Sequence, residues 1–137
     1  MRNPGLLVLG AVVLLGLSVA ANEKPSAAYV QAMKDLQTAQ GGMRNAVTAK
    51  DYDAIAKHAA TFKASFDAAE AFWTAKKADD AVNAAKAGVK GATDLAAAAA
   101  AKNDEGIAAA QRAIGGTCMG CHTAHRERLP DGTFEIK

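Results

Sequence analysis

The stretch from Asp51 to Trp73, DYDAIAKHAATFKASFDAAEAFW, decides the fold because it carries the best-defined helical period in the chain. Its apolar residues recur at alternating spacings of three and four, so they lie on one stripe of an α-helix. The stripe comprises Tyr52, Ile55, Ala59, Phe62, Phe66, Ala69 and Trp73. Asp51 stands directly before this stripe and is a suitable N-cap residue. The sequence therefore predicts an amphipathic helix here.

The segment that precedes this helix has the same period. Its stripe comprises Tyr29, Met33, Leu36, Gln40, Met43 and Val47. Two adjacent glycines, Gly41 and Gly42, fall inside the segment and mark a place where a helix could bend. A second amphipathic helix is therefore predicted before Asp51.

Two more helices are predicted after Trp73. The first runs from about Asp79 to Ala101, and its seam is built from small residues, so a partner helix can approach it closely. Its stripe comprises Val82, Ala85, Val89 and Ala92, with Gly88 and Gly91 between them. The second begins near Asn103, a capping residue followed by two acidic residues that suit a helix N-terminus. Its stripe comprises Ile107, Ala110, Ile114, Cys118 and Cys121.

Four helices of about 20 residues joined by short loops predict an all-α fold, an antiparallel four-helix bundle. The composition agrees, because about a quarter of the residues are alanine and only three are proline. Aromatic residues make up only 5% of the chain, so a core of protein atoms alone would be thin. We expect a bulky group to fill part of it.

Length and charge exclude several classes of protein. The chain of 137 residues is long enough for one domain. Its 16 basic and 14 acidic residues form no long run of one sign, which argues against a nucleic-acid partner. No motif for hydrolysis, phosphate binding or nucleotide binding is present, so we do not expect an enzyme.

The N-terminus resembles a Sec signal peptide. Arg2 is followed by an apolar run from Leu6 to Leu17 and by small residues, and cleavage after Ala20 or Ala21 fits this pattern. An uncleaved anchor is the alternative, but the run is shorter than the roughly 20 residues of a membrane span. The expected organisation is a signal peptide at 1–21 and a bundle domain at 22–137, exported to the periplasm and without stable membrane insertion.

The pentapeptide at 118–122, Cys-Met-Gly-Cys-His, is the C-x-x-C-H motif of c-type haem attachment. On a helix, Cys118 and Cys121 share one face and can form thioethers to the two vinyl groups of one porphyrin. His122 can then supply an axial nitrogen to the iron. The motif predicts one covalently attached haem c, held near the C-terminal helix.

Three other interpretations of this pentapeptide were weighed. A structural zinc site needs four protein ligands, and beyond this cluster only His58 and His125 remain. A thioredoxin-like redox pair belongs at the start of a helix in a βαβ unit, and nothing here looks like βαβ. A plain disulfide across C-x-x-C is strained. Haem attachment explains the motif better than any of these.

With these residues in place, the chain resembles the class II c-type cytochromes, the family of cytochrome c prime and its low-spin relatives. In that family a four-helix bundle carries haem at a C-x-x-C-H motif near the C-terminus. The resemblance covers most of residues 22–128, and includes the glycines before Cys118 and an arginine, Arg126, four residues after His122. His125 stands where the family usually has a tyrosine.

The chain departs from the family pattern at three points. The long loop usual between the second and third helices is nearly absent. Residues 128–137 form a C-terminal extension where many members stop, and Phe134 and Ile136 could fold back over apolar surface. Tyr29 replaces an arginine common four residues before the distal residue of the first helix.

The residue on the far side of the iron decides the function. Met33 lies on the inward stripe and is followed by Lys34, resembling the methionine that low-spin members use as sixth ligand. An ordinary core methionine is the alternative for this residue. Met43 lies ten residues further along, about 15 Å along the axis, and is interpreted as core packing.

The remaining candidates are placed elsewhere. Met119 is held inside the attachment loop. His58 falls at the edge of its helical stripe and is expected to be partly solvated. His125 lies one turn beyond His122, on the proximal side, where it would touch a haem edge or solvent. Trp73 is a possible contact of the haem.

Arg126 has two interpretations. One turn beyond His122, it could pair with a haem propionate or shield the proximal histidine, and its charge would then tune the potential of the iron. Alternatively it is a solvated arginine at a basic helix end with Arg128, favoured by the helix dipole.

The resemblance and the motif together imply a periplasmic monohaem cytochrome that carries single electrons between redox partner proteins through a low-spin His122/Met33 haem. The alternative is a five-coordinate haem protein, like cytochrome c prime, that binds NO or CO. A third alternative is a helical binding module without haem. Either a monomer or a homodimer is compatible with the sequence.

Overall fold

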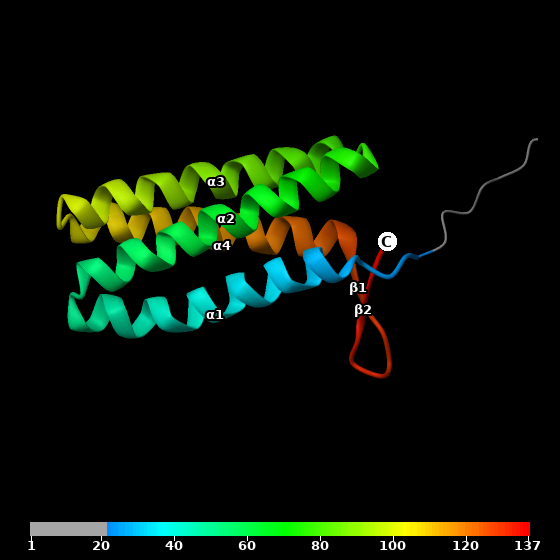
Figure 1. Ribbon diagram of the computed structural model, residues 1–137, viewed down its shortest axis with the longest axis horizontal. Coiled ribbons are helices and arrows are strands. Elements are labelled where there is room, and N and C mark those ends of the chain that lie inside the picture. Colours follow the sequence, from blue (N-terminus) through cyan, green and yellow to red (C-terminus); the bar gives the residue numbers. More distant parts are fainter. Residues whose placement is uncertain (1–21) are drawn as a thin grey trace, which may run out of the picture.

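The computed structural model describes residues 22–137, and the expected signal peptide at 1–21 lies outside the described residues. Four helices follow one another along the chain: α1 (Ala27–Ala49), α2 (Tyr52–Lys76), α3 (Asp79–Ala100) and α4 (Asp104–His125). They lie side by side in alternating directions (Figure 1). The predicted antiparallel bundle is therefore confirmed. Two short strands, β1 (Arg126–Arg128) and β2 (Phe134–Ile136), complete the described chain.

The helix boundaries follow the capping residues. The side chain of Asp51 accepts a hydrogen bond from the amide of Ala54, and that of Asn103 accepts one from Gly106, as the N-cap predictions require. Only short connections join the helices, so each helix packs beside the one before it. In each of these connections a lysine adopts the left-handed conformation: Lys50, Lys77 and Lys102.

The core is divided into two clusters of buried side chains. The mid-bundle cluster draws on all four helices, and its largest members are Leu36, Met43, Ile55, Phe62, Phe66, Leu95, Ile107 and Ile114. The end cluster lies nearer the hairpin and comprises Tyr29, Ala69, Trp73, Ala81 and Ala85. The aromatic residues of α2 are thus split between the two clusters.

Helix α3 brings its neighbours unusually close. A Cβ placed on Gly88 would stand 2.4 Å from the ring of Phe66, and one placed on Gly91 would stand 2.9 Å from the side chain of Ile114. Both glycines are therefore needed for the close approach of α2 and α4 to α3. The expectation that the small seam of this helix admits a close partner is confirmed.

Three of the six residues in the predicted stripe of α1 are not buried. Gln40 is exposed, and the buried residues of this helix are Tyr29, Ala32, Leu36, Ala39, Met43 and Ala46. The predicted and observed stripes share Tyr29, Leu36 and Met43, but alanines replace the larger residues between them. Met33 is consequently half-buried at the edge of the stripe. Helix α1 also continues through Gly41 and Gly42.

The C-terminal extension folds as a β-hairpin, which the all-α prediction did not include. Strands β1 and β2 are antiparallel, with Arg126 opposite Ile136 and Arg128 opposite Phe134. The backbone of Glu23 pairs with Ile136 through two hydrogen bonds of 2.9 and 2.8 Å. The two ends of the described chain thus meet at one end of the bundle (Figure 1).

Helices α1 and α4 enclose the only loosely packed side of the described bundle. The pairs α1–α2, α2–α3 and α3–α4 pack closely along their lengths, whereas the backbones of α1 and α4 remain further apart. No helix within residues 22–137 is long and apolar enough to cross a membrane.

Candidate functional site

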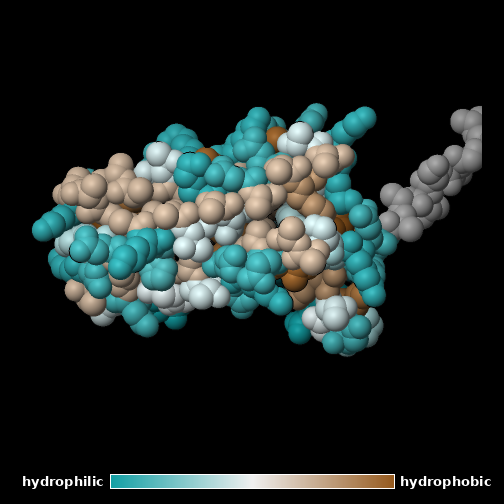
Figure 2. Space-filling view, in the orientation of Figure 1, coloured by the Kyte–Doolittle hydropathy of each residue, from teal (hydrophilic) through white to brown (hydrophobic). Residues whose placement is uncertain are grey.

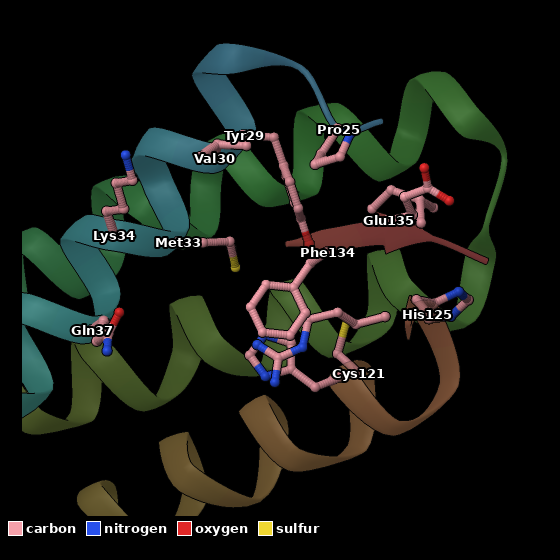
Figure 3. A pocket seen from close by; sticks show the side chains of 13 residues that line it. Pro25, Tyr29, Val30, Met33, Lys34, Gln37, Cys121, His125, Phe134 and Glu135 are labelled. Atoms are coloured by element: carbon pink, nitrogen blue, oxygen red, sulfur yellow. The ribbon is translucent and has the colours of Figure 1, made fainter. Parts of the chain in front are cut away.

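A cavity of about 260 Å³ lies between α1 and α4, at the end of the bundle that carries the hairpin. In Figure 2 hydrophobic side chains are visible at this end, next to the hairpin. Three elements provide its walls, and Figure 3 shows the side chains: Pro25, Tyr29, Val30, Met33, Lys34 and Gln37 on the α1 side; Cys121, His122 and His125 on α4; and Arg126, Phe134, Glu135 and Ile136 on the hairpin.

Met33 lies on the α1 wall of this cavity. Its side chain extends into the cavity, on the side opposite α4 (Figure 3). It also packs against both core clusters. Met43, by contrast, is only 1% exposed and belongs to the mid-bundle cluster. The two methionines of α1 that were candidates for the iron therefore have different surroundings, and only Met33 faces the cavity.

The predicted attachment residues lie on α4 opposite Met33. Cys121 and His122 line the main cavity, and Cys118 lines a smaller adjoining one of about 30 Å³. Both cysteines are free thiols and half-buried, and burial raises the pKa of each. Met119 is 70% exposed and points away from the core. The helical spacing thus brings both thiols to the inner side of α4.

The imidazole of His122 favours its neutral form. Burial lowers its pKa first, and the nearby charge of Arg126 lowers it further. A neutral imidazole has a free nitrogen lone pair, which is the form that binds a metal. His122 therefore faces the cavity with its imidazole in the neutral form.

An aromatic group lies beside the cavity, and its member Tyr29 lines the cavity wall. The indole Nε1 of Trp73 donates a hydrogen bond of 3.3 Å to the hydroxyl of Tyr29. Phe72 stacks on Tyr29 with ring centroids 4.2 Å apart. Burial, and then the charge of Cys121, raises the pKa of Tyr29 to about 12. Tyr29 is therefore a neutral part of the cavity wall.

The two other histidines have partners of their own. His125 Nε2 lies 2.7 Å from Asp80 Oδ2, and its ring centroid is 4.8 Å from that of Trp73. His58 packs against Gly42 between α1 and α2, where a Cβ on the glycine would stand 2.4 Å from its ring. His125 thus lines the cavity, on the α4 side as expected, while His58 lies along the bundle away from it.

Arg126 is not on the helix, contrary to the expectation. Helix α4 ends at His125, and Arg126 is the first residue of β1, with extended dihedral angles and its amide bonded to the carbonyl of His122. The helix stops because the chain turns to pair with β2. The guanidinium lies 4.2 Å from the centroid of the Phe134 ring and still lines the cavity.

Sequence reasoning missed the hairpin wall of the site, Phe134, Glu135 and Ile136. A signal was available, because Asp131-Gly132 is a turn sequence and the residues after it alternate between apolar and polar. Gly132 indeed has a φ of 85°, which only glycine adopts without strain. The sequence predicts that the extension covers apolar surface. It does not predict that Ile136 pairs with Glu23, because Glu23 lies near the other end of the described chain.

Metal-binding donor groups lie on two walls of the cavity. Within residues 22–137, no three side chains of His, Cys, Asp or Glu gather as a metal-binding group, so the ligands of a zinc site are not assembled there. One imidazole and one thioether face the cavity from opposite helices, with two thiols on the inner side of α4. These are the groups that a covalently tied haem requires.

Comparison of the chain with protein-family models, curated proteins and solved structures returns no match.

Proposed function

We propose that this protein is a monohaem c-type cytochrome, similar to low-spin class II cytochromes, that carries single electrons between redox partner proteins. One observation carries the proposal: the side chains of Met33 and His122 line the same cavity from opposite helices, beside the cysteines of a C-x-x-C-H motif. A methionine that only fills the core does not need to face a cavity. Met43, on the same helix, has none.

Each of these residues has a separate role in holding the haem. Cys118 and Cys121 are the covalent anchors, and their position one helical turn apart fixes the macrocycle against α4. His122, which follows Cys121 in the C-x-x-C-H motif, would be the proximal ligand, and its lowered pKa keeps the imidazole neutral. Met33 is the sixth ligand. Arg126 is a binding residue of the site, where its charge lies beside the cavity and favours the carboxylates of the haem.

The haem iron, when bound, supplies a one-electron couple, and a methionine opposite histidine raises the reduction potential. Met33 and His122 stand on long helices whose ends are capped, so their separation would change little when a bound haem is oxidised or reduced. The apolar side chains among the walls would limit the access of water to a bound haem. A site with both axial positions filled by protein atoms is suited to electron transfer.

The surroundings of the site favour a transient redox partner. Such encounters need only a small interface near the cavity mouth. Cleavage after Ala21 would leave 15 basic and 14 acidic residues, so long-range steering of a partner is weak. Export by the signal peptide would place the protein in the periplasm, where haem attachment and this exchange of electrons would take place. A monomer or a homodimer would serve equally.

The deciding experiment is an optical spectrum of the exported protein in its ferric and ferrous forms, with and without CO. The proposal requires a low-spin haem with a methionine-to-iron charge-transfer band and no response to CO. A high-spin spectrum that shifts with CO would replace electron transfer by the binding of NO or CO at a five-coordinate haem. A colourless protein would overturn both and leave a helical binding module.

A matched pair of variants identifies the anchors. Replacing Cys118 and Cys121 by Ser should abolish retention of haem after denaturation with acidified acetone. Replacing Thr117 by Ser, in the same turn of α4, should leave it unchanged.

A further inference from the structure

The hairpin forms one complete wall of the cavity. Phe134 and Ile136 line it from β2, and Arg126 lines it from β1. Ile136 also packs against the end cluster, beside Trp73. Without the hairpin, the gap between α1 and α4 would be open at this end of the bundle.

The ring of Phe134 is turned toward the cavity rather than away from the protein (Figure 3). The guanidinium of Arg126 covers one side of it at 4.2 Å, and that of Arg128 lies 5.9 Å from the same centroid. A cation above an aromatic ring stabilises the position of the ring. The side chain is 39% exposed, so it stands at the mouth of the cavity, between the cavity and solvent.

Several contacts fix the hairpin to the bundle. The backbone of Ile136 bonds to that of Glu23 in both directions, and the amide of Lys137 donates to the carbonyl of His125 at 3.2 Å. Glu23 in turn accepts a hydrogen bond of 2.5 Å from Lys76 on α2. The hairpin is therefore joined to the N-terminal segment, to α2 through that segment, and to α4. It is a fixed part of the fold.

From these contacts we propose that the C-terminal hairpin is a wall of the haem site and that Phe134 controls the access of small external ligands to the iron. Phe134 contacts the haem, and its ring stands at the mouth of the cavity. Arg126 is a positioning residue, which holds this ring in place. The inference rests on the proposed function, because it assigns a role toward the haem.

Contact is tested by proton NMR of the ferrous protein, or of its CO adduct if the ferrous protein is high-spin. Nuclear Overhauser effects are expected between the Phe134 ring and the haem protons. These effects should be absent in Phe134→Leu, which lacks the aromatic ring protons. An assigned Phe134 ring without any such effect would overturn the contact.

Access is tested by CO rebinding after flash photolysis in a Met33→Ala background, or in the unchanged protein if it binds CO by itself. Adding Phe134→Ala should raise the bimolecular rate by about tenfold, since the mouth loses an aromatic ring. Phe134→Leu should restore most of the barrier. Leu129→Ala, a change in the hairpin outside the cavity lining, is the matched control.

Failure of this inference can be told apart from failure of the proposed function. A colourless unchanged protein refutes the cytochrome itself. A coloured protein in which Phe134→Ala and Leu129→Ala rebind CO at the rate of their parent refutes the role of Phe134 alone. Far-UV circular dichroism of each variant checks that the bundle is retained, and Phe134→Leu keeps the test valid if the Ala variant unfolds.

Discussion

Trp73 on α2 donates its indole N–H to the hydroxyl of Tyr29 on α1, at 3.3 Å, beside the cavity that Tyr29 lines. Both side chains are buried, with exposures of 2% and 8%. The bond is therefore a buried link between the helix that carries Met33 and its neighbour. Its loss would leave an indole donor without a partner.

We expect Tyr29→Phe to destabilise the fold by about 1–3 kcal/mol, the cost of leaving a buried donor unpaired. Urea unfolding followed by circular dichroism measures this. Tyr52→Phe is the control, because the hydroxyl of Tyr52 bonds to Asp104 in an exposed position and its loss should cost less. Equal losses in the two variants would show that the Trp73 bond has no special weight.

Met33 and Met43 should respond in opposite ways to replacement by Ala. Met33→Ala is expected to convert a low-spin haem to high spin and to permit CO binding, with a modest loss of stability because the side chain is half-buried. Met43→Ala should leave the spectrum unchanged and cost about 2–5 kcal/mol, since it empties part of the core. An unchanged spectrum in Met33→Ala would eliminate the proposed ligand.

The glycines of the helices should also divide into two kinds. Gly88→Ala is expected to destabilise the bundle by about 1–3 kcal/mol, because the new methyl group would overlap the ring of Phe66. Gly41→Ala should stabilise it by up to about 1 kcal/mol, since nothing stands within 4 Å of the new atom and alanine favours helices. Thermal unfolding of both variants measures the two effects. An unfolding temperature of Gly88→Ala equal to that of the unchanged protein would contradict the prediction.

Stability should decrease on the acid side partly through Asp104. Hydrogen bonds from Lys50, and then from Tyr52, lower the pKa of this carboxyl below its usual 3.8. A lowered pKa in the folded state adds stability above pH 4, and that stability disappears as the pH falls through the folded pKa. Asp104→Asn should therefore reduce the change of the urea midpoint of unfolding between about pH 4 and pH 2. An identical pH profile in the variant would contradict this.

The bundle could be predicted from sequence because its signals are local. Asp51 and Asn103 mark helix starts, and alternating apolar spacings mark the inner faces. The inner face of α1 was harder to predict, because this helix is rich in alanine. Ala39 and Gln40 are adjacent, so shifting the predicted stripe by one residue exchanges the two. Small side chains give a weak periodic signal.

The residues of the candidate site could likewise be predicted only in part. Helical spacing placed Cys121, His122 and Met33 toward one interior, since these positions follow from the register of two predicted helices. Phe134 and the displaced Arg126 could not be placed, because the hairpin is fixed by its pairing with Glu23 at the opposite end of the sequence. Local patterns do not reveal such distant pairings.

The pairing of Glu23 with Ile136 also bears on the order of assembly. Packing between α1 and α2, α2 and α3, and α3 and α4 joins neighbours along the chain, and contacts of this kind form early and at low entropic cost. The terminal pairing spans nearly the whole described chain, so its loop-closure entropy is the greatest and we expect it to form last. Until then, a bundle with its helices already packed would present the thiols of Cys118 and Cys121 through an open end. Assembly in this order would leave an interval for the proposed haem, a large planar group, to enter before the chain ends join.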